Sequence, residues 1–126
     1  MLREAPDVSL IAENAEALPF KSGHFAAQSS IFLFHELPRD ARRRVLHEAL
    51  RTLEPGGVLA VLDSAQLAES RDIEPFLHSF AAEYHEPYYE DYLRDDLSAL
   101  FEEVGFVVED MQRVFLSKLV VGRKPS

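Results

Sequence analysis

The fold class is decided by the stretch Arg39–Leu62, which reads RDARRRVLHEALRTLEPGGVLAVL. Its first part spaces apolar residues by three or four, which predicts a helix over Arg39–Leu53 with one apolar stripe. Pro55-Gly56-Gly57 ends this helix, because proline cannot continue it and glycine accepts the left-handed conformation of a helix exit. Val58–Leu62 then follows as an apolar strand. A helix, a tight turn and a buried strand in this order form half of a crossover unit.

Two strands are predicted before this stretch. Val8–Ala12 is a short, mostly apolar run with two β-branched residues, as expected for a buried parallel strand. Phe25–Phe34 is a second apolar run, and it follows the turn-like Lys21-Ser22-Gly23. Buried strands need neighbours, so we expect both runs in a sheet.

Two helices and a hairpin are predicted after the stretch. The helices cover Ile73–Tyr84 and Tyr92–Val104, and Gly105 closes the second one. Phe106–Val108 and Val114–Val121 are β-type segments with no helix between them. They should pair as an antiparallel hairpin at one end of the sheet.

Strands that alternate with helices predict an α/β fold. We expect a mostly parallel sheet with helices on both faces and one antiparallel strand from the terminal hairpin. The chain has 126 residues with 47% hydrophobic content, which is enough for one core but too short for two domains. A single domain over residues 1–126 is therefore expected.

Composition excludes several classes of partner and site. The formal net charge is -9, from 22 acidic and 13 basic side chains, so the surface repels nucleic acid and anionic membranes. The absence of cysteine excludes disulfides, thiolate metal sites and a cysteine nucleophile. The charged first residues lack the apolar run of a secretory signal, so a cytoplasmic protein is expected. The basic helix face is expected to be solvated and is assigned no role; it consists of Arg42, Arg43, Arg44 and Arg51.

Three stretches carry a resemblance to a known family. They are Asn14–Phe20 (NAEALPF), Phe32–Pro38 (FLFHELP) and Arg51–Gly57 (RTLEPGG). Together they resemble the class I S-adenosylmethionine-dependent methyltransferases, in particular the group that includes the ubiquinone and menaquinone biosynthesis enzymes. Their order and approximate spacing are those of the family, so the resemblance spans residues 8–121. The first stretch is distinctive, whereas a proline-glycine-glycine turn after a helix is common.

The resemblance implies a partial Rossmann-like methyltransferase fold with S-adenosyl-L-methionine as cofactor. In the family, an acidic residue at the position of Asn14 hydrogen-bonds the adenine amino group, and Asn14 can still accept through its amide oxygen. The backbone at Ala15 contacts the adenine ring, and Leu18 helps to wall it. The methionine part of the cofactor lies at the end of the second strand, which here consists of Ser29, Ser30 and Ile31. Open α/β sheets indeed bind ligands beyond the carboxyl ends of their strands.

Two departures from the family pattern matter. Phe25-Ala26 replaces the usual Phe-Asp, so a polar group is missing at the start of that strand. The family's glycine-rich loop, and the strand whose acidic residue binds the ribose, have no counterpart before Val8. The resemblance therefore implies that one copy of the chain binds the cofactor poorly. It also implies that the Phe25 strand is an exposed sheet edge, for which we expect a homodimer.

His35 and Glu36 are the catalytic candidates, because they follow the Phe25 strand where a substrate approaches. Either is suited to act as a general base or to position a hydroxyl or amine acceptor. The alternative is a solvated turn before the helix. Methyl transfer mainly needs alignment, so no catalytic dyad is required. No metal is assigned, because the spacing of His35, Glu36, His85 and Glu86 matches no standard zinc pattern.

An aromatic and polar cluster around Pro87 is the candidate acceptor pocket. Its members are Tyr84, His85, Glu86, Tyr88 and Tyr89. In the family this region covers the substrate, and tyrosine rings can stack on an acceptor. Asp63, at the end of the Val58 strand, is expected to face the same crevice. The alternatives are a loop packed by tyrosines and an Asp63 that caps the next turn.

Two functions remain open at this point. The first is S-adenosylmethionine-dependent methyl transfer to a small-molecule acceptor, incomplete in this chain alone. The second is a non-catalytic dimerising or regulatory unit with a methyltransferase fold. The fold does not identify the acceptor or the methylated atom. The interpretation requires residues near Asn14 and Ser30 to lie side by side at the mouth of the sheet.

Overall fold

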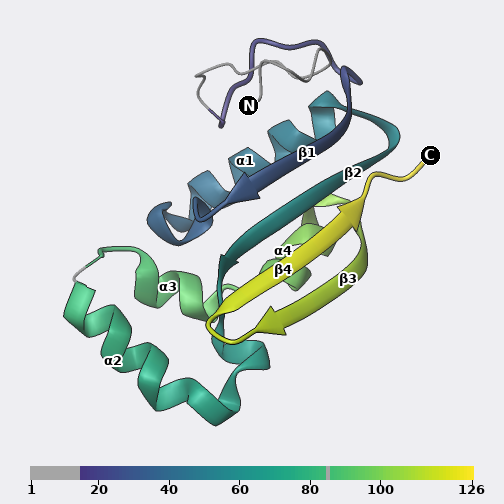
Figure 1. The fold of residues 1–126 in the computed structure, drawn as a ribbon. Coiled ribbons are helices and arrows are strands. Elements are labelled where there is room, and N and C mark those ends of the chain that lie inside the picture. The colour runs from purple at the N-terminus through teal and green to yellow at the C-terminus, as the bar shows by residue number, and fades with distance from the viewer. Residues whose placement is uncertain (1–14, 85) are drawn as a thin grey trace, which may run out of the picture.

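A computed structural model describes residues 15–84 and 86–126, which contain a four-stranded sheet (Figure 1). The strand order is β1-β2-β4-β3, and the bounds in that order are Phe25–Ile31, Leu53–Ser64, Ser117–Arg123 and Val107–Val114. β1 and β2 pair in parallel, whereas β4 is antiparallel to both β2 and β3. β1, β2 and β3 therefore run in one direction and β4 is reversed. This confirms the predicted α/β fold and its antiparallel strand, while the predicted strand Val8–Ala12 lies outside the described residues.

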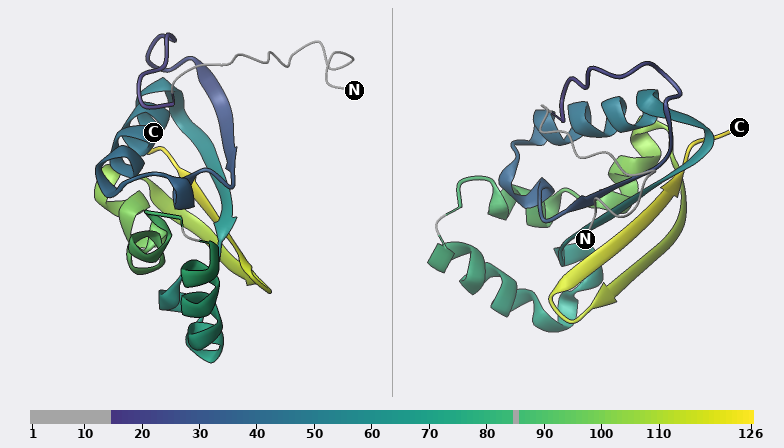
Figure 2. Two further views of the ribbon diagram at one scale, coloured as in Figure 1. Left: turned by 90° about the vertical axis from the view of Figure 1, so that its left-hand side faces the viewer. Right: turned by 45° about the horizontal axis from the view of Figure 1, so that its top comes forward.

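The α-helices are α1 (Arg39–Thr52), α2 (Glu74–Tyr84), α3 (Tyr89–Arg94) and α4 (Leu97–Val104). Figure 2 shows α1 and α4 on the same face of the sheet, and α2 beyond the carboxyl end of β2. Within the described residues, helices cover this one face, in contrast to the predicted covering of both faces. On the other face, Ala60, Leu62 and Val121 are only half-buried. No helix in the described part of the chain is long and apolar enough to cross a membrane.

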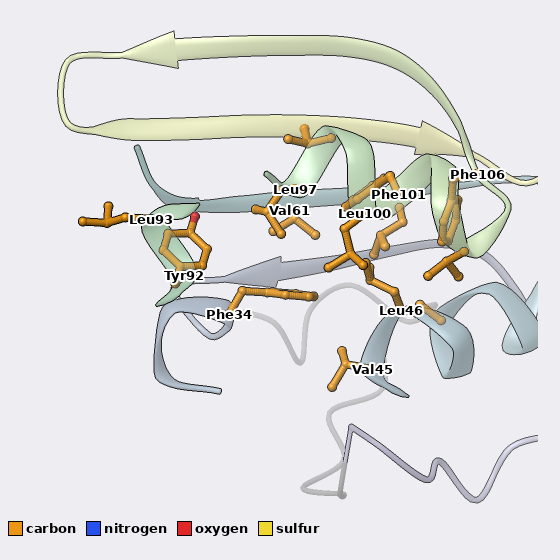
Figure 3. Packing of buried hydrophobic residues seen from close by; sticks show 14 of the residues in the cluster. Phe34, Val45, Leu46, Val61, Tyr92, Leu93, Leu97, Leu100, Phe101 and Phe106 are labelled. Atoms are coloured by element: carbon orange, nitrogen blue, oxygen red, sulfur yellow. The ribbon is translucent and has the colours of Figure 1, made fainter. Parts of the chain in front are cut away.

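The core lies between the sheet and these two helices (Figure 3). Leu46 of α1 and Leu100 and Phe101 of α4 are fully buried there with Val61 of β2 and Val120 of β4. Burial of each such side chain contributes about 1.5–3 kcal/mol. The apolar stripe predicted for the first helix is therefore confirmed as the face that packs on the sheet.

The connection from α1 to β2 differs from the prediction. α1 ends at Thr52, and Leu53 already has the extended backbone of β2. Glu54 precedes a proline, which disfavours a helical conformation and moves the helix end upstream. Gly56 does have a positive φ of 80°, but it lies inside the first part of the strand. Pro55-Gly56-Gly57 is thus an irregular strand start rather than a turn.

The predicted helix Tyr92–Val104 is wrong, because the chain forms two helices there. The break is at Asp95 and Asp96. Asp96 accepts a hydrogen bond from the backbone N–H of Ala99 at 3.3 Å, which favours a helix start at that position. Gly105, with a φ of 126°, closes α4 as predicted.

The terminal hairpin is confirmed, although its turn lies elsewhere. Val114 ends β3 and pairs with Ser117, the first residue of β4. Phe115 occupies the turn with a φ of 55°, where asparagine or glycine would be usual. The turn therefore has no sequence signal, which explains the misplaced boundary.

Candidate functional site

A cavity of about 560 Å³ lies between β1, α1 and residues 15–20. We call it the strand pocket. Five of the six predicted cofactor residues line it, namely Ala15, Leu18, Ser29, Ser30 and Ile31. Asn14, the sixth, lies outside the described residues. Its remaining walls are mostly apolar and come from Phe20, His24, Phe25, Ala27, Gln28, Leu33, Phe34, Val45, Ala49 and Leu59.

Residues 15–20 are fastened to α1 by three charged side chains, Arg44, Glu48 and Arg51, of which Arg44 pairs with Glu16. The backbone N–H of Leu18 donates to Glu48 at 2.7 Å, and Arg51 donates to the carbonyls of Leu18 at 3.1 Å and Phe20 at 2.9 Å. Arg51 also pairs with Glu48 at 2.8 Å and thereby lowers the pKa of that carboxyl. Arg51 thus has a structural role, although the sequence assigned it none. It holds one wall of the strand pocket in place.

Ser30 is the notable polar group of the strand pocket. Its hydroxyl is buried, and among the described residues it has no hydrogen-bond partner. A buried hydroxyl without a partner costs about 1–3 kcal/mol relative to a hydrogen-bonded one. A ligand in this pocket would gain by accepting or donating a hydrogen bond there.

A second cavity of about 420 Å³ lies at the carboxyl ends of β1 and β2, where α2 and α3 approach the sheet. We call it the tyrosine pocket. Its lining is mostly apolar and consists of Phe32, His35, Ser64, Phe76, Leu77, Phe80, Glu86, Tyr89, Leu116 and Ser117. A largely apolar cavity with a few converging polar groups is the usual form of a small-molecule site.

His35 lies at the polar end of the tyrosine pocket and is hydrogen-bonded to Asp63, which does not line the pocket. Nδ1 of His35 lies 2.8 Å from a carboxylate oxygen of Asp63, so this nitrogen carries the proton that is donated. The bond to Asp63 raises the pKa of His35, whereas burial lowers it to a smaller extent. Asp63 is fully buried and also accepts from the backbone N–H of Phe34 at 2.7 Å. Nε2 of His35 is left to face Glu86, 3.6 Å away.

The two pockets meet where β1 ends. Ile31 lines the strand pocket, and the next residue, Phe32, lines the tyrosine pocket. Phe32 has a φ of 53°, which is uncommon for an aromatic residue. Its N–H donates to the carbonyl of Leu62 at 2.8 Å and so holds the turn against β2. Adjacent residues of this short segment therefore line the two pockets.

Sequence comparison links the chain to a family. Residues 1–57 match the family model of the methyltransferase domain. The ubiquinone/menaquinone biosynthesis C-methyltransferase UbiE of Methylobacterium nodulans is 41% identical over 61 residues, which are 48% of this chain and 23% of that protein. Over these residues the chain is similar to methyltransferases. It spans about a quarter of the length of this curated relative.

Solved structures show the same methyltransferase fold. One is a protein of Bacillus halodurans C-125 reported as a methyltransferase, with a TM-score of 0.69 and 16% sequence identity. The match covers 96% of this chain and 79% of that protein's chain. The complex between the Haloferax volcanii Trm112 methyltransferase activator and a methyltransferase gives a TM-score of 0.67 and 17% identity. That match covers 92% of this chain and 60% of the other.

The predicted acceptor-side residues of this methyltransferase-like chain divide into two groups. His35 and Tyr89 line the tyrosine pocket, and Tyr89 also contacts the hydroxyl of Ser64. Asp63 is fully buried and does not line the pocket, but it binds His35. Glu36 and Tyr88 are exposed and do not line it. The Tyr84 side chain and His85 lie outside the described residues. Phe76, Phe80 and Leu116 were missed, because apolar residues of a helix or turn carry no signal for a ligand.

The buried Arg42 corrects the predicted solvated helix face. Arg42 is fully buried on α1 and donates to Asp91 at 2.8 Å and Asp95 at 2.9 Å. It also donates to the carbonyl of Phe34 at 3.2 Å and that of Tyr88 at 3.1 Å. Both carboxylates lie about fifty positions further along the chain, at separations of 49 and 53 residues. Arg42 therefore positions Phe34, the residue that precedes His35.

Proposed function

We propose that the chain supports S-adenosylmethionine-dependent methyl transfer to a small-molecule acceptor. The observation that carries the proposal is the strand pocket, where two separate stretches marked by the family resemblance meet in one cavity. Ala15 and Leu18 come from one stretch, and Ser29, Ser30 and Ile31 come from the end of β1. The strand pocket runs along β1 from Phe25 to the carboxyl end at Ile31, and open α/β sheets usually bind their ligands at such strand ends.

The residues of the strand pocket fit the chemistry of this cofactor. Its apolar walls suit an adenine ring beside Ala15 and Leu18, and its volume falls within the range of about 300–1,000 Å³ that ligand sites have. The unpaired hydroxyl of Ser30 offers a hydrogen bond to the polar methionine part. When bound, S-adenosylmethionine supplies a methyl group on a positively charged sulfur. We propose that Ile31 is the residue closest to that methyl group.

The tyrosine pocket is the proposed acceptor site. Phe32, Phe76 and Phe80 provide apolar walls, and His35 provides the polar end. We propose that an acceptor held there approaches the methyl group directly at the end of β1, opposite the sulfur, because an in-line displacement requires this alignment. His35 is proposed to position the acceptor's nucleophilic atom, with Asp63 fixing the imidazole. The acceptor would be an apolar molecule with one hydroxyl or amine.

A second candidate function is a non-catalytic dimerising unit. The observation that favours it is the edge strand β1, whose Ile31 has 66% of its surface exposed. An apolar strand edge is prone to pair with another chain. In this candidate the tyrosine pocket would be an unused remnant.

Calorimetric titration with S-adenosylhomocysteine tests the first function. Micromolar binding by the wild-type chain would support a working or complemented site, and Ser30→Ala should then lower the affinity several-fold, since a hydrogen bond is worth about 0.5–1.5 kcal/mol. Ser98→Ala is the matched control, because Ser98 also has a buried hydroxyl without a partner among the described residues but lies on α4. Undetectable heat with the folded wild-type chain would favour the dimerising unit.

A further inference from the structure

The polar end of the tyrosine pocket brings several carboxylates close to one imidazole. His35, Glu36 and Glu86 each offer one ligand atom, and these atoms lie within 4.8 Å of one another. Asp63 adds a third carboxylate, 2.8 Å from Nδ1 of His35. Carboxylates this close repel one another, and a cation among them relieves the repulsion.

His35 is oriented as a metal-ligating histidine usually is. Such a histidine donates its other ring N–H to a carboxylate, which fixes the tautomer and the ring orientation. Asp63 accepts that bond here, and its own position is fixed by the backbone N–H groups of Phe34 and Ser64 at 2.7 and 2.8 Å. The lone pair of Nε2 is thereby directed away from Asp63, toward Glu86.

Glu86 completes the geometry from another part of the chain. Its Oε2 lies 3.6 Å from Nε2 of His35 and, among the described residues, makes no hydrogen bond although the atom is buried. Two ligands of a tetrahedral ion with bonds of about 2.0–2.1 Å lie roughly 3.4 Å apart. Glu36 is exposed next to His35, so its side chain is able to rotate toward the same point.

We propose that His35, Glu36 and Glu86 bind a divalent transition-metal ion at the mouth of the tyrosine pocket. One imidazole nitrogen and two carboxylate oxygens suit Zn²⁺ and Mn²⁺. Three protein ligands leave a coordination position open to the pocket, as in catalytic metal sites. An acceptor hydroxyl bound there would lose its proton more readily. This choice of acceptor rests on the proposed function, whereas binding of the ion does not.

The spacing of the ligands explains why a sequence pattern misses this site. His35 and Glu36 are adjacent on a short turn, while Glu86 precedes α3 and is fifty positions away. Arg42 helps to join the two segments by donating to the carbonyls of Phe34 and Tyr88. The local spacing rules for zinc sites therefore do not apply.

Titration of the untagged chain with ZnCl₂ tests the proposal, without cofactor or acceptor. Calorimetry should give one Zn²⁺ per chain, and the electron paramagnetic resonance signal of free Mn²⁺ should fall with the same stoichiometry. His35→Gln and Glu86→Gln should each weaken binding at least about tenfold, a loss that changes near a metal site commonly cause. Circular dichroism checks that each variant is folded.

His78→Gln is the matched control. Nδ1 of His78 lies 2.8 Å from Glu90 and its Nε2 lies 3.9 Å from Glu74, but this group is on the outer part of α2. Its replacement should leave Zn²⁺ affinity unchanged. The proposal is overturned if neither Zn²⁺ nor Mn²⁺ binds. It is also overturned if binding depends on His78 and not on His35 and Glu86. Intact Zn²⁺ binding without S-adenosylhomocysteine binding would count against the proposed function alone.

Discussion

Arg42 is a buried cation that joins three segments of the molecule. It lies on α1, pairs with Asp91 and Asp95 of the α3 region, and donates to the carbonyl of Phe34. Removing one partner of a buried ion pair leaves the other charges uncompensated. The positions of His35 and of the tyrosine pocket therefore depend on Arg42, although Arg42 does not line the pocket.

Arg42→Ala should lower the free energy of unfolding by about 3–5 kcal/mol, the usual cost of breaking a buried pair. Urea denaturation followed by circular dichroism measures this. Arg94→Ala is the control, because Arg94 pairs with Glu90 at 2.9 Å on an exposed surface of α3. Equal losses in the two variants would contradict the central role of Arg42.

Single residues were predicted from sequence where a motif marks them. Leu18 belongs to the distinctive stretch Asn14–Phe20, Ser30 lies at the end of the predicted Phe25 strand, and both line the strand pocket. Arg42 was taken for a solvated residue, because its helix face is basic and its acidic partners lie far along the chain. Buried polar pairs of this kind depend on tertiary structure and leave no local pattern.

At the scale of elements, β4 and α4 pack closely at Gly122. A Cβ atom at this position would lie 2.5 Å from the ring of Phe101. Gly122→Ala should therefore destabilise the protein by about 1–3 kcal/mol, as overpacking usually does. In the double variant with Phe101→Leu, the loss measured by urea denaturation should be smaller than the sum of the single losses. Strict additivity would show that the two residues do not contact each other.

The ion pair of Glu48 and Arg51, which holds one wall of the strand pocket, makes the stability of the protein depend on pH. Arg51 lowers the pKa of Glu48 from its ordinary 4.5. Since the folded pKa is below the unfolded one, the stabilisation is present above about pH 4.5 and is lost as the pH falls through the lower folded value. Glu48→Gln should thus reduce stability near neutral pH and flatten its decline in acid. Parallel stability curves for variant and wild type would refute this.

Helices and strands were predicted well where a long apolar pattern marks them. They were predicted poorly where polar side chains determine the ends of a helix. α1 follows its predicted stripe, and β1 begins at Phe25 as predicted but ends at Ile31 instead of Phe34. The break between α3 and α4 was missed, because the apolar pattern continues across Asp95 and Asp96. Asp96 caps α4 and Asp95 pairs with Arg42, and the spacing of apolar residues indicates neither interaction.

At the scale of the whole molecule, the sheet ends at two unpaired edges among the described residues, β1 and β3. We expect copies of the chain to associate through β1, where Ile31 is exposed. Light scattering after gel filtration should give a dimer for wild type and a monomer for Ile31→Lys, because a charge blocks edge pairing. Val114→Lys, an equally exposed position on β3, should remain dimeric. A wild-type monomer at high concentration would argue against association.

The measurement closest to the central claim is a ¹H–¹⁵N NMR titration of the chain with S-adenosylhomocysteine. If the strand pocket holds the adenosyl group, the amide signals of Ala15, Leu18 and Ser29 to Ile31 should shift with one common affinity, while those of β3 should stay in place. Unshifted spectra, or shifts confined to residues away from the strand pocket, would contradict the account.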